Sequence, residues 1–257
     1  MIHETAVVDA GAELAEDVEV GPFTVIGPGV SMGPGCRVGP HAVVEGNTRL
    51  GAGVRVFQFA SVGAPPQDKK YAGGETRLEV GDGTVIRECA TLHVGTEEDE
   101  GVTRVGADCL VMAYVHIAHD CQVGDGVILS NAVTLAGHVH VGDRAVLGGM
   151  SAIHQFCRIG PHAFVGGASA VSKDVPPFAS VAGNRARLYG LNSVGLERAG
   201  FAPETVEGLK RAFKALFHKK RPRDEALAEV AASPDAEIPE VQQVMTFFRE
   251  SERGVVR

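Results

Sequence analysis

Histidine and aspartate side chains gather in the middle of this chain. The segment AYVHIAHDCQVG, residues 113–124, places His116 and His119 three residues apart, with Asp120 directly after the second. An imidazole beside a carboxylate suits a general base that works near neutral pH, because the carboxylate orients the ring. Two histidines and a carboxylate also suit a metal ion such as zinc. The spacing alone leaves three alternatives open: a base with its partner, a metal site, or polar residues at surface turns.

A six-residue repeat must position these side chains. Aliphatic residues recur at every sixth position from Val8 to Val62, ten in succession, and again from Val105 to Val171, twelve in succession. A period of six fits neither a helix nor an alternating strand, and it is typical of a parallel β-helix. The sequence therefore predicts one short strand and one turn per hexad. Three hexads then make a triangular coil of about 18 residues.

The stacking of such coils brings residues 18 positions apart into one column. Asp120 and His138 share a column, and His154 follows Ala136 by the same interval. His119 precedes Asp120 at a turn, so we expect these histidines and the aspartate along one edge of the prism. No two histidines lie five residues apart, which is the spacing of a histidine pair in hexapeptide-repeat carbonic anhydrases. We therefore expect a catalytic base and no metal.

Two segments interrupt the repeat and a third ends it. Residues 63–77 and the acidic residues 95–103 are expected to leave the coil as loops, which on a rigid scaffold are common places for function. In KDVPPF, residues 173–178, two prolines are expected to stop strand pairing. We therefore predict a β-helix domain over residues 1–180 and a C-terminal helical domain over residues 190–257.

The C-terminal segment has helical patterns of apolar residues. Helices are expected to begin near Pro203, to cover residues 224–232 and to cover residues 239–250. The run KRAFKALFHKKRPR, residues 210–223, is basic within an acidic protein. It is either the contact surface for an acidic partner or a solvated helix face.

Composition narrows the function classes. The chain has 257 residues and a net charge of −8, which argues against nucleic-acid binding. It contains no apolar run of about 18 residues, so no membrane span is expected, and we see no signal peptide.

The five cysteines form no CxxC pair and no plausible zinc set, and their odd number suggests reduced cytoplasmic thiols. Four of them fall in a column of small interior residues and are interpreted as core filler, namely Cys36, Cys109, Cys121 and Cys157.

Several motifs in order resemble the UDP-N-acetylglucosamine O-acyltransferases, the family that begins lipid A biosynthesis. The motifs are FQFASVG (57–63), QDKKYAGGETR (67–77), HIAHDCQVG (116–124), NAVTLAGHV (131–139) and GGMSAIHQFC (148–157). The resemblance covers essentially the whole chain. It implies an all-β, left-handed parallel β-helix of hexapeptide repeats with a C-terminal α-helical tail, and a cytoplasmic homotrimer with active sites between subunits. It also implies transfer of an (R)-3-hydroxyacyl chain from acyl carrier protein to the 3-hydroxyl of UDP-N-acetylglucosamine, without a cofactor.

The resemblance further implies a role for individual residues. His119 matches the general base, Asp120 its orienting partner, and the Gly137 N–H a donor to the oxyanion. Gly167 matches the position that limits acyl length, where glycine leaves room for a longer chain. The residues that match substrate contacts are Gln67, Asp68, Lys70, His116, His138, His154, Gln155, Asn192 and Arg198.

The chain departs from the family pattern in its tail, at Val194, Glu197 and Ala199, and Arg185 stands where some members have histidine. These positions bear on the nucleotide contacts and on acyl length.

Two other function classes stay open. One keeps the fold but changes the reaction, as in the N-acyltransferase of the same pathway or an acetyl-CoA-dependent acetyltransferase. The other is a metal-dependent lyase or a non-catalytic hexapeptide scaffold.

Overall fold

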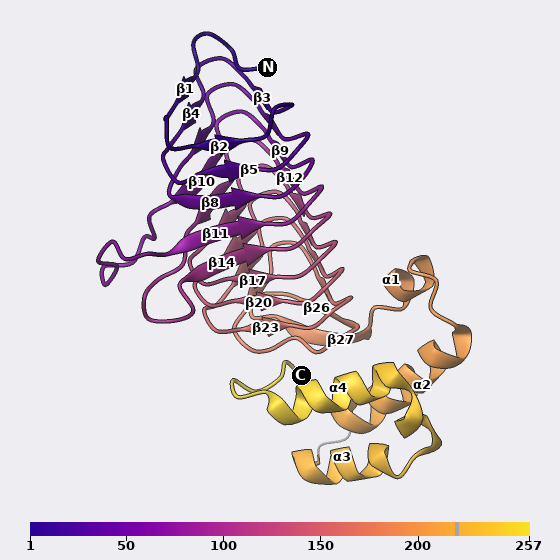
Figure 1. Ribbon diagram of the computed structural model, residues 1–257. Helices are drawn as coiled ribbons and strands as arrows, with labels where there is room; N and C mark the ends of the chain where they lie inside the picture. The colour runs from indigo at the N-terminus through magenta and orange to yellow at the C-terminus, as the bar shows by residue number, and fades with distance from the viewer. Residues whose placement is uncertain (219–220) are drawn as a thin grey trace.

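The chain folds into a tapering three-sided prism with a helical segment beyond its wide end (Figure 1). The structure is a computed structural model that describes residues 1–218 and 221–257. Lys219 and Lys220 of the basic run lie outside the described residues. Each side of the prism is a sheet of short strands, and the sheets contain nine, eight and ten strands within the described part of the chain.

From β1 to β25, successive strands along the chain pass from one sheet to the next, so each sheet takes every third strand; β26 and β27 both join the sheet of β24. Sheet A contains β3 (Glu19–Val20), β6 (Arg37–Val38), β9 (Arg55–Val56), β12 (Val85–Ile86), β15 (Leu110–Val111), β18 (Ile128–Leu129), β21 (Val146–Leu147), β24 (Phe164–Val165), β26 (Ala179–Ala182) and β27 (Arg187–Leu191). Sheet B contains β1 (Val7–Val8), β4 (Val25–Ile26), β7 (Val43–Val44), β10 (Ser61–Ala64), β13 (Thr91–His93), β16 (His116–Ile117), β19 (Thr134–Leu135), β22 (Ala152–Ile153) and β25 (Ala170–Val171). Sheet C contains β2 (Glu13–Leu14), β5 (Ser31–Met32), β8 (Asn47–Leu50), β11 (Arg77–Val80), β14 (Val102–Val105), β17 (Gln122–Val123), β20 (His140–Val141) and β23 (Arg158–Ile159).

The register confirms the hexad repeat. Ile117 pairs in parallel with Leu135, and Leu135 with Ile153, each 18 residues on. These side chains are at most 2% exposed, because the second residue of each strand points into the prism. The chain is a left-handed parallel β-helix, as the family resemblance implies. The four cysteines interpreted as core filler are also buried, and burial raises the pKa of their thiols, that of Cys121 to about 12.

The outer surfaces of the sheets differ in polarity. On sheet A the outward residues of five consecutive strands are apolar and form one column, namely Val85, Leu110, Ile128, Val146 and Phe164. On sheet C the corresponding column is polar and charged, with Arg49, Glu79, Arg104, Gln122, His140 and Arg158. Sheet A therefore presents a surface suited to burial against another chain, and sheet C one suited to water.

The repeat extends one strand farther than the sequence predicts. β26 pairs in parallel with β24, although Pro176 and Pro177 precede it. The expectation that these prolines stop strand pairing is therefore wrong. Both prolines lie between strands, ahead of the corner residue Phe178, where no N–H is needed for the ladder.

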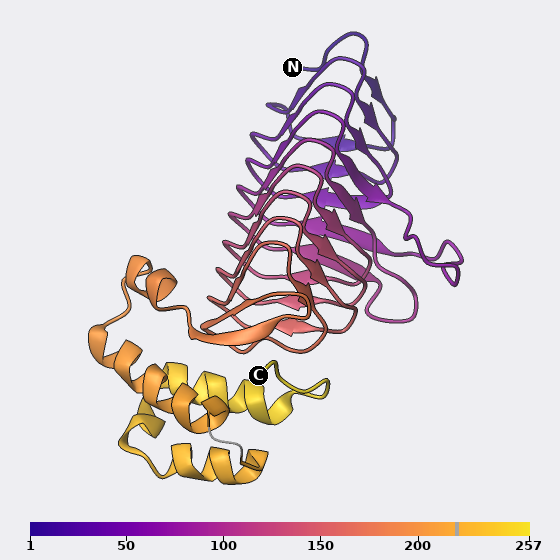
Figure 2. The same ribbon diagram turned by 180° about the vertical axis from the view of Figure 1, so that it is seen from behind.

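The tail consists of helices α1 (Ser193–Arg198), α2 (Pro203–Phe213), α3 (Arg223–Ala231) and α4 (Pro239–Glu250), with a π-helical turn over Lys214–His218 and a 3-10 turn over Pro234–Glu237. The three predicted helices are confirmed, and α1 is additional. Helices α2, α3 and α4 lie together beyond the last coils, and α1 lies apart from them to one side (Figure 2). No helix among the described residues is long and apolar enough to cross a membrane. The division into domains at residues 180 and 190 stays a prediction, since β26 and β27 occupy that interval.

Candidate active site

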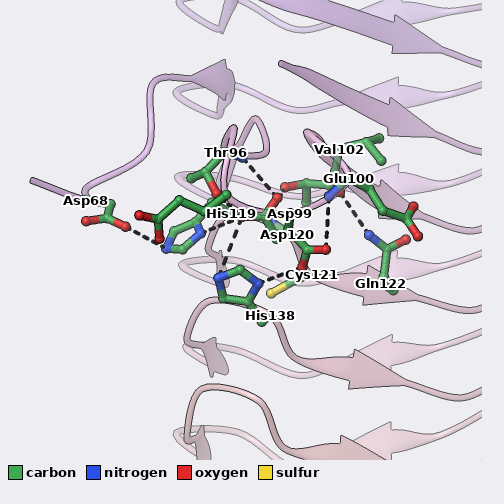
Figure 3. A network of polar contacts seen from close by, with 12 residues as sticks. Asp68, Thr96, Asp99, Glu100, Val102, His119, Asp120, Cys121, Gln122 and His138 are labelled. Carbon is green, nitrogen blue, oxygen red and sulfur yellow. Dashed lines mark hydrogen bonds and ion pairs between the residues drawn. The ribbon is translucent and has the colours of Figure 1, made fainter. Parts of the chain in front are cut away.

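The histidine cluster lies at the corner between sheets B and C (Figure 3). His119 and Asp120 connect β16 to β17, and one coil later Gly137 and His138 connect β19 to β20. Asp120 and His138 both adopt left-handed backbone conformations, with φ of 58° and 60°. Aspartate and histidine tolerate this conformation better than branched residues do. The corner geometry therefore places the same turn position of two coils side by side.

His119 and Asp120 form a hydrogen-bonded pair. Nδ1 of His119 lies 2.8 Å from Oδ2 of Asp120, and the two side chains are 15% and 1% exposed. A protonated Nδ1 donates to the carboxylate, which leaves Nε2 as the nitrogen able to accept a proton. The pair thus has the arrangement of a general base with an orienting carboxylate.

The Asp120 carboxylate is held by further donors. Thr96 donates its backbone N–H to Oδ1 at 2.9 Å and its hydroxyl to Oδ2 at 2.6 Å, and the N–H of Asp120 itself donates to the Thr103 hydroxyl. Burial alone raises the pKa of Asp120, but the hydrogen bonds from His119 and Thr96 outweigh it and hold the pKa below its usual value. Asp120 therefore remains an anion that can stabilise a charged imidazole.

Gly137 lies directly against the His119 ring. A Cβ at position 137 would lie 2.6 Å from Cε1 and 2.7 Å from Nε2 of His119, which is too close for any side chain. Among the described residues, the Gly137 N–H has no hydrogen-bond acceptor. A free N–H close to the nitrogen that accepts a proton is what an oxyanion donor requires.

His138 completes the cluster. Its ring meets that of His119 edge to face at 5.1 Å, and its Nε2 lies 3.8 Å from Oδ2 of Asp120. The ring stacks on Phe156, one coil on, with centroids 4.5 Å apart. Its Nδ1 lies 2.8 Å from Oδ2 of Asp99, in the acidic insertion between β13 and β14.

The insertion between β10 and β11 reaches the same corner. Oδ2 of Asp68 lies 3.9 Å from Nε2 of His119. Oδ1 of Asp68 accepts the backbone N–H of Lys70, while Nζ of Lys70 pairs with Glu98 at 3.0 Å. Gln67 is exposed on the same insertion. The structure thus brings Asp68 to the cluster, with Gln67 and Lys70 on its outer side.

Other predicted residues extend the site along sheet B and the corner. His116 lies on β16, bonded through Nδ1 to the Thr91 hydroxyl at 2.7 Å, and burial lowers the pKa of its imidazole. His154 and Gln155 occupy the next turn of the corner, and Nδ1 of His154 lies 3.2 Å from a guanidinium nitrogen of Arg253.

Three predicted residues lie elsewhere in this chain. Asn192 and Arg198 line a groove of about 700 Å³ together with Ile128 and Phe164 of sheet A. The side chain of Asn192 caps α1 by accepting the Gly195 N–H. Gly167 lies between β24 and β25, at the corner of sheets A and B. Sheet A is the side of the prism opposite the His119 corner, so a single chain does not bring these three residues to the cluster.

The cluster also contains the atoms of a possible metal site. One ligand atom each from His119, Asp120 and His138 lies within 4.8 Å of the other two. However, the nearest two of them already share a hydrogen bond at 2.8 Å, which favours a proton-transfer pair.

Residues 103–137 match the family model for the bacterial transferase hexapeptide repeat, and residues 174–256 match the model described as UDP-N-acetylglucosamine O-acyltransferase, domain 2. The acyl-[acyl-carrier-protein]–UDP-N-acetylglucosamine O-acyltransferase of Herminiimonas arsenicoxydans is 51% identical over 100% of this chain and 99% of its own length. This chain belongs to the UDP-N-acetylglucosamine O-acyltransferase family. The solved structure of the family member LpxA from Acinetobacter baumannii has a TM-score of 0.97 at 44% identity and covers 100% of this chain and 99% of its own. The UDP-N-acetylglucosamine acyltransferase from Francisella novicida has a TM-score of 0.95 at 40% identity, over 100% and 94%.

Sequence reasoning missed several residues of the candidate site. Thr96 and Asp99 lie in the acidic insertion. The sequence predicts a functional loop there but does not indicate which of its residues contact the histidines. Phe156 supports His138 from the next coil, and its separation of 18 residues was a usable signal. His93 is buried beside His116, with ring centroids 4.9 Å apart.

Proposed function

We propose that this protein transfers a (R)-3-hydroxyacyl chain from acyl carrier protein to the 3-hydroxyl of UDP-N-acetylglucosamine, the first step of lipid A biosynthesis. Curated relatives about half identical over the whole chain bear the name of this activity. The observation in this chain that carries the proposal is the hydrogen bond between His119 and Asp120, with Nε2 of His119 left to accept a proton beside the free N–H of Gly137.

The reaction follows from this arrangement. Nε2 of His119 takes the proton of the sugar 3-hydroxyl while that oxygen attacks the thioester carbonyl carbon. The imidazolium that forms is stabilised by the Asp120 carboxylate at 2.8 Å. The oxygen of the tetrahedral intermediate accepts a hydrogen bond from the Gly137 N–H. The C–S bond then breaks, and the imidazolium returns its proton to the leaving thiolate. No cofactor enters this scheme.

We propose that the sugar nucleotide binds between the His119 corner and the insertion of residues 65–76. Asp68, 3.9 Å from Nε2 of His119, lies at the right distance to contact the sugar. His138 faces the His119 ring from the next coil. Lys70 is exposed and supplies a positive charge for a phosphate. Gln67, His116, His154 and Gln155 then line the remainder of the cleft.

A homotrimer accounts for the residues that a single chain leaves apart. Asn192 and Arg198 border the apolar column on sheet A, which is a surface suited to contact with a neighbour. If sheet A of one subunit packs near the His119 corner of the next, these two residues join the site from a neighbouring subunit. The free cysteines are compatible with a reducing, cytoplasmic location.

One transfer assay tests the function. Carrier proteins loaded with 3-hydroxyacyl chains of different length are offered with UDP-N-acetylglucosamine or its 3-amino analogue, and the products are identified by mass spectrometry. We expect an ester of UDP-N-acetylglucosamine. Product only from the amine, or only from acetyl-CoA, would favour a related acyltransferase instead.

The three potential ligand atoms at the corner make a metal-dependent lyase the second candidate. Elemental analysis of the purified protein and dialysis against a chelator separate the two functions. We expect acyl transfer to be unchanged after dialysis. Stoichiometric metal that is required for activity would show that His119 is a ligand and not a base.

A further inference from the structure

Side chains of the acidic insertion between β13 and β14 are bonded to the insertion of residues 65–76 and to Arg104 on β14. Of its four consecutive acidic residues, Glu97 accepts the backbone N–H of Gly74, Glu98 pairs with Lys70, and Glu100 pairs with Arg104 at 2.8 Å. Asp99, the third of the four, therefore comes from a segment whose neighbours are bonded to two different parts of the chain. In Figure 3 a dashed line joins its carboxylate to the His138 ring.

Asp99 makes a direct contact with the second histidine of the cluster. Its Oδ2 lies 2.8 Å from Nδ1 of His138, whose side chain is 15% exposed. A carboxylate only accepts hydrogen bonds, so Nδ1 of His138 must carry the proton of this bond. Nε2 is then directed toward Asp120, at 3.8 Å.

The other groups that face His138 do not fix its ring in this way. The Asp120 carboxylate lies 3.8 Å from Nε2, beyond hydrogen-bond distance. His119 presents its ring at 5.1 Å, Phe156 stacks on one face, and His140 follows on β20. Phe156 fixes the plane of the imidazole, but the two orientations that a half-turn about the Cβ–Cγ bond exchanges share that plane. Among the described residues, Asp99 makes the hydrogen bond that selects between the two orientations.

We infer that Asp99 is a positioning residue for this reaction. By accepting the Nδ1–H of His138, it holds Nε2 of that ring toward the place where the sugar nucleotide and the His119–Asp120 pair meet. This inference rests on the proposed function, because it assigns the orientation of His138 to the acceptor side of the same site. One short segment thereby contacts two residues of the site. Its Glu98 pairs with Lys70, and its Asp99 pairs with His138.

Kinetics of matched variants test the inference. Asp99→Ala removes the acceptor, and we expect kcat/KM for the sugar nucleotide to fall about tenfold. Asp99→Asn keeps an acceptor oxygen without the charge and is expected to restore most of the loss. Glu225→Gln, at an exposed acid of α3, is the control and is expected to stay within about twofold of the wild type. Circular dichroism checks that all variants are folded.

A double-mutant cycle separates positioning from a structural role. In a His138→Ala background, Asp99→Ala should cause no further loss, because there is no ring left to orient. An equal loss in both backgrounds would overturn the inference, since Asp99 would then act independently of His138.

The protonated nitrogen of His138 can also be identified without substrate, by the ¹⁵N chemical shifts of its ring, assigned with His138→Ala. We expect Nδ1 to be protonated in the wild type, with Nε2 becoming the protonated nitrogen of the neutral ring in Asp99→Ala. A neutral ring protonated at Nε2 in the wild type would overturn the inference. Because this measurement needs no turnover, a protein with Nδ1 protonated but no acyl transfer would refute the proposed function alone.

Discussion

Gly137 lies one coil away from His119 and so close that a Cβ at 137 would meet the imidazole at 2.6 Å from Cε1. The absence of a side chain at one turn is what makes room for the ring at the turn before it. The same glycine offers its free N–H at that point. Space for the proposed base and the proposed donor to the oxyanion are thus supplied by a single residue.

Gly137→Ala should therefore disturb the base rather than the fold. The added methyl group must displace the His119 ring from its place beside Asp120, and we expect kcat to fall about 100-fold, within the range that proton-transfer catalysis contributes. Gly11→Ala is the control, because a Cβ there meets nothing closer than 3.3 Å. Initial rates at saturating substrates, with near-ultraviolet circular dichroism for the fold, measure the difference. Full activity in Gly137→Ala would contradict the tight contact.

His119→Ala removes the proposed base itself. We expect kcat to fall by about 100- to 10,000-fold, which is the usual contribution of general acid–base catalysis. The side chain is partly exposed at a corner, so its loss should leave the fold and the proposed homotrimer intact. Transfer rates and light scattering of the same preparation test both expectations. Activity near that of the wild type would exclude the mechanism.

Thr96→Val tests how the Asp120 carboxylate is held. The substitution keeps the size of the side chain and the backbone donor but removes the hydroxyl that lies 2.6 Å from Oδ2. A hydrogen bond to a charged group contributes about 1.5–3 kcal/mol, so we expect kcat to fall about tenfold. Thr246→Val, at an exposed position of α4, should have no effect. Equal rates in both variants would show that the Thr96 hydroxyl does not support the pair.

The fold could be predicted from the sequence because a period of six reports directly which side chains point inward. The same repeat places residues 18 positions apart in one column, and this predicted that Asp120 and His138 would be neighbours. The insertions have no period, so nothing in the sequence says that Thr96 would bond Asp120 or that Asp99 would reach His138. Their contacts depend on the path of the loop in three dimensions.

The positions of Asn192 and Gly167 show a different limit. Their motifs resemble those of the family, but in one chain they lie on or beside sheet A, away from the corner of His119. A resemblance assigns residues to a site without saying which subunit supplies them. The prolines 176 and 177 illustrate a third limit, since their effect depends on whether they fall in a strand or at a corner.

Gly167→Met tests the proposed limit on acyl length. A longer side chain at the corner of sheets A and B should take up space that the proposed role leaves to the acyl chain, and we expect the preferred acyl chain to become shorter. Gly167→Ala, with a Cβ no closer than 3.3 Å to its neighbours, should cause a smaller shift in the same direction. Product masses from a mixture of loaded carrier proteins measure the preference. An unchanged profile in the methionine variant would remove Gly167 from this role.

His93 gives the protein a dependence of stability on pH. Its side chain is 4% exposed and its Nδ1 has no partner among the described residues. Burial, with smaller effects of His116 and His119, lowers the pKa of His93 from 6.5 to about 4. Between these values the unfolded chain binds more protons than the folded one, so acidification favours unfolding.

His93→Gln should weaken this dependence. The pKa shift corresponds to a loss of about 2 kcal/mol of unfolding free energy between pH 7.5 and 5 from this one group. The glutamine variant, which has no ionisable group there, should lose that much less over the same interval. His3→Gln, at an exposed ring, should follow the wild type. Urea unfolding at fixed protein concentration and several pH values gives the slopes, and identical slopes for His93→Gln and the wild type would show that His93 titrates normally in the folded protein.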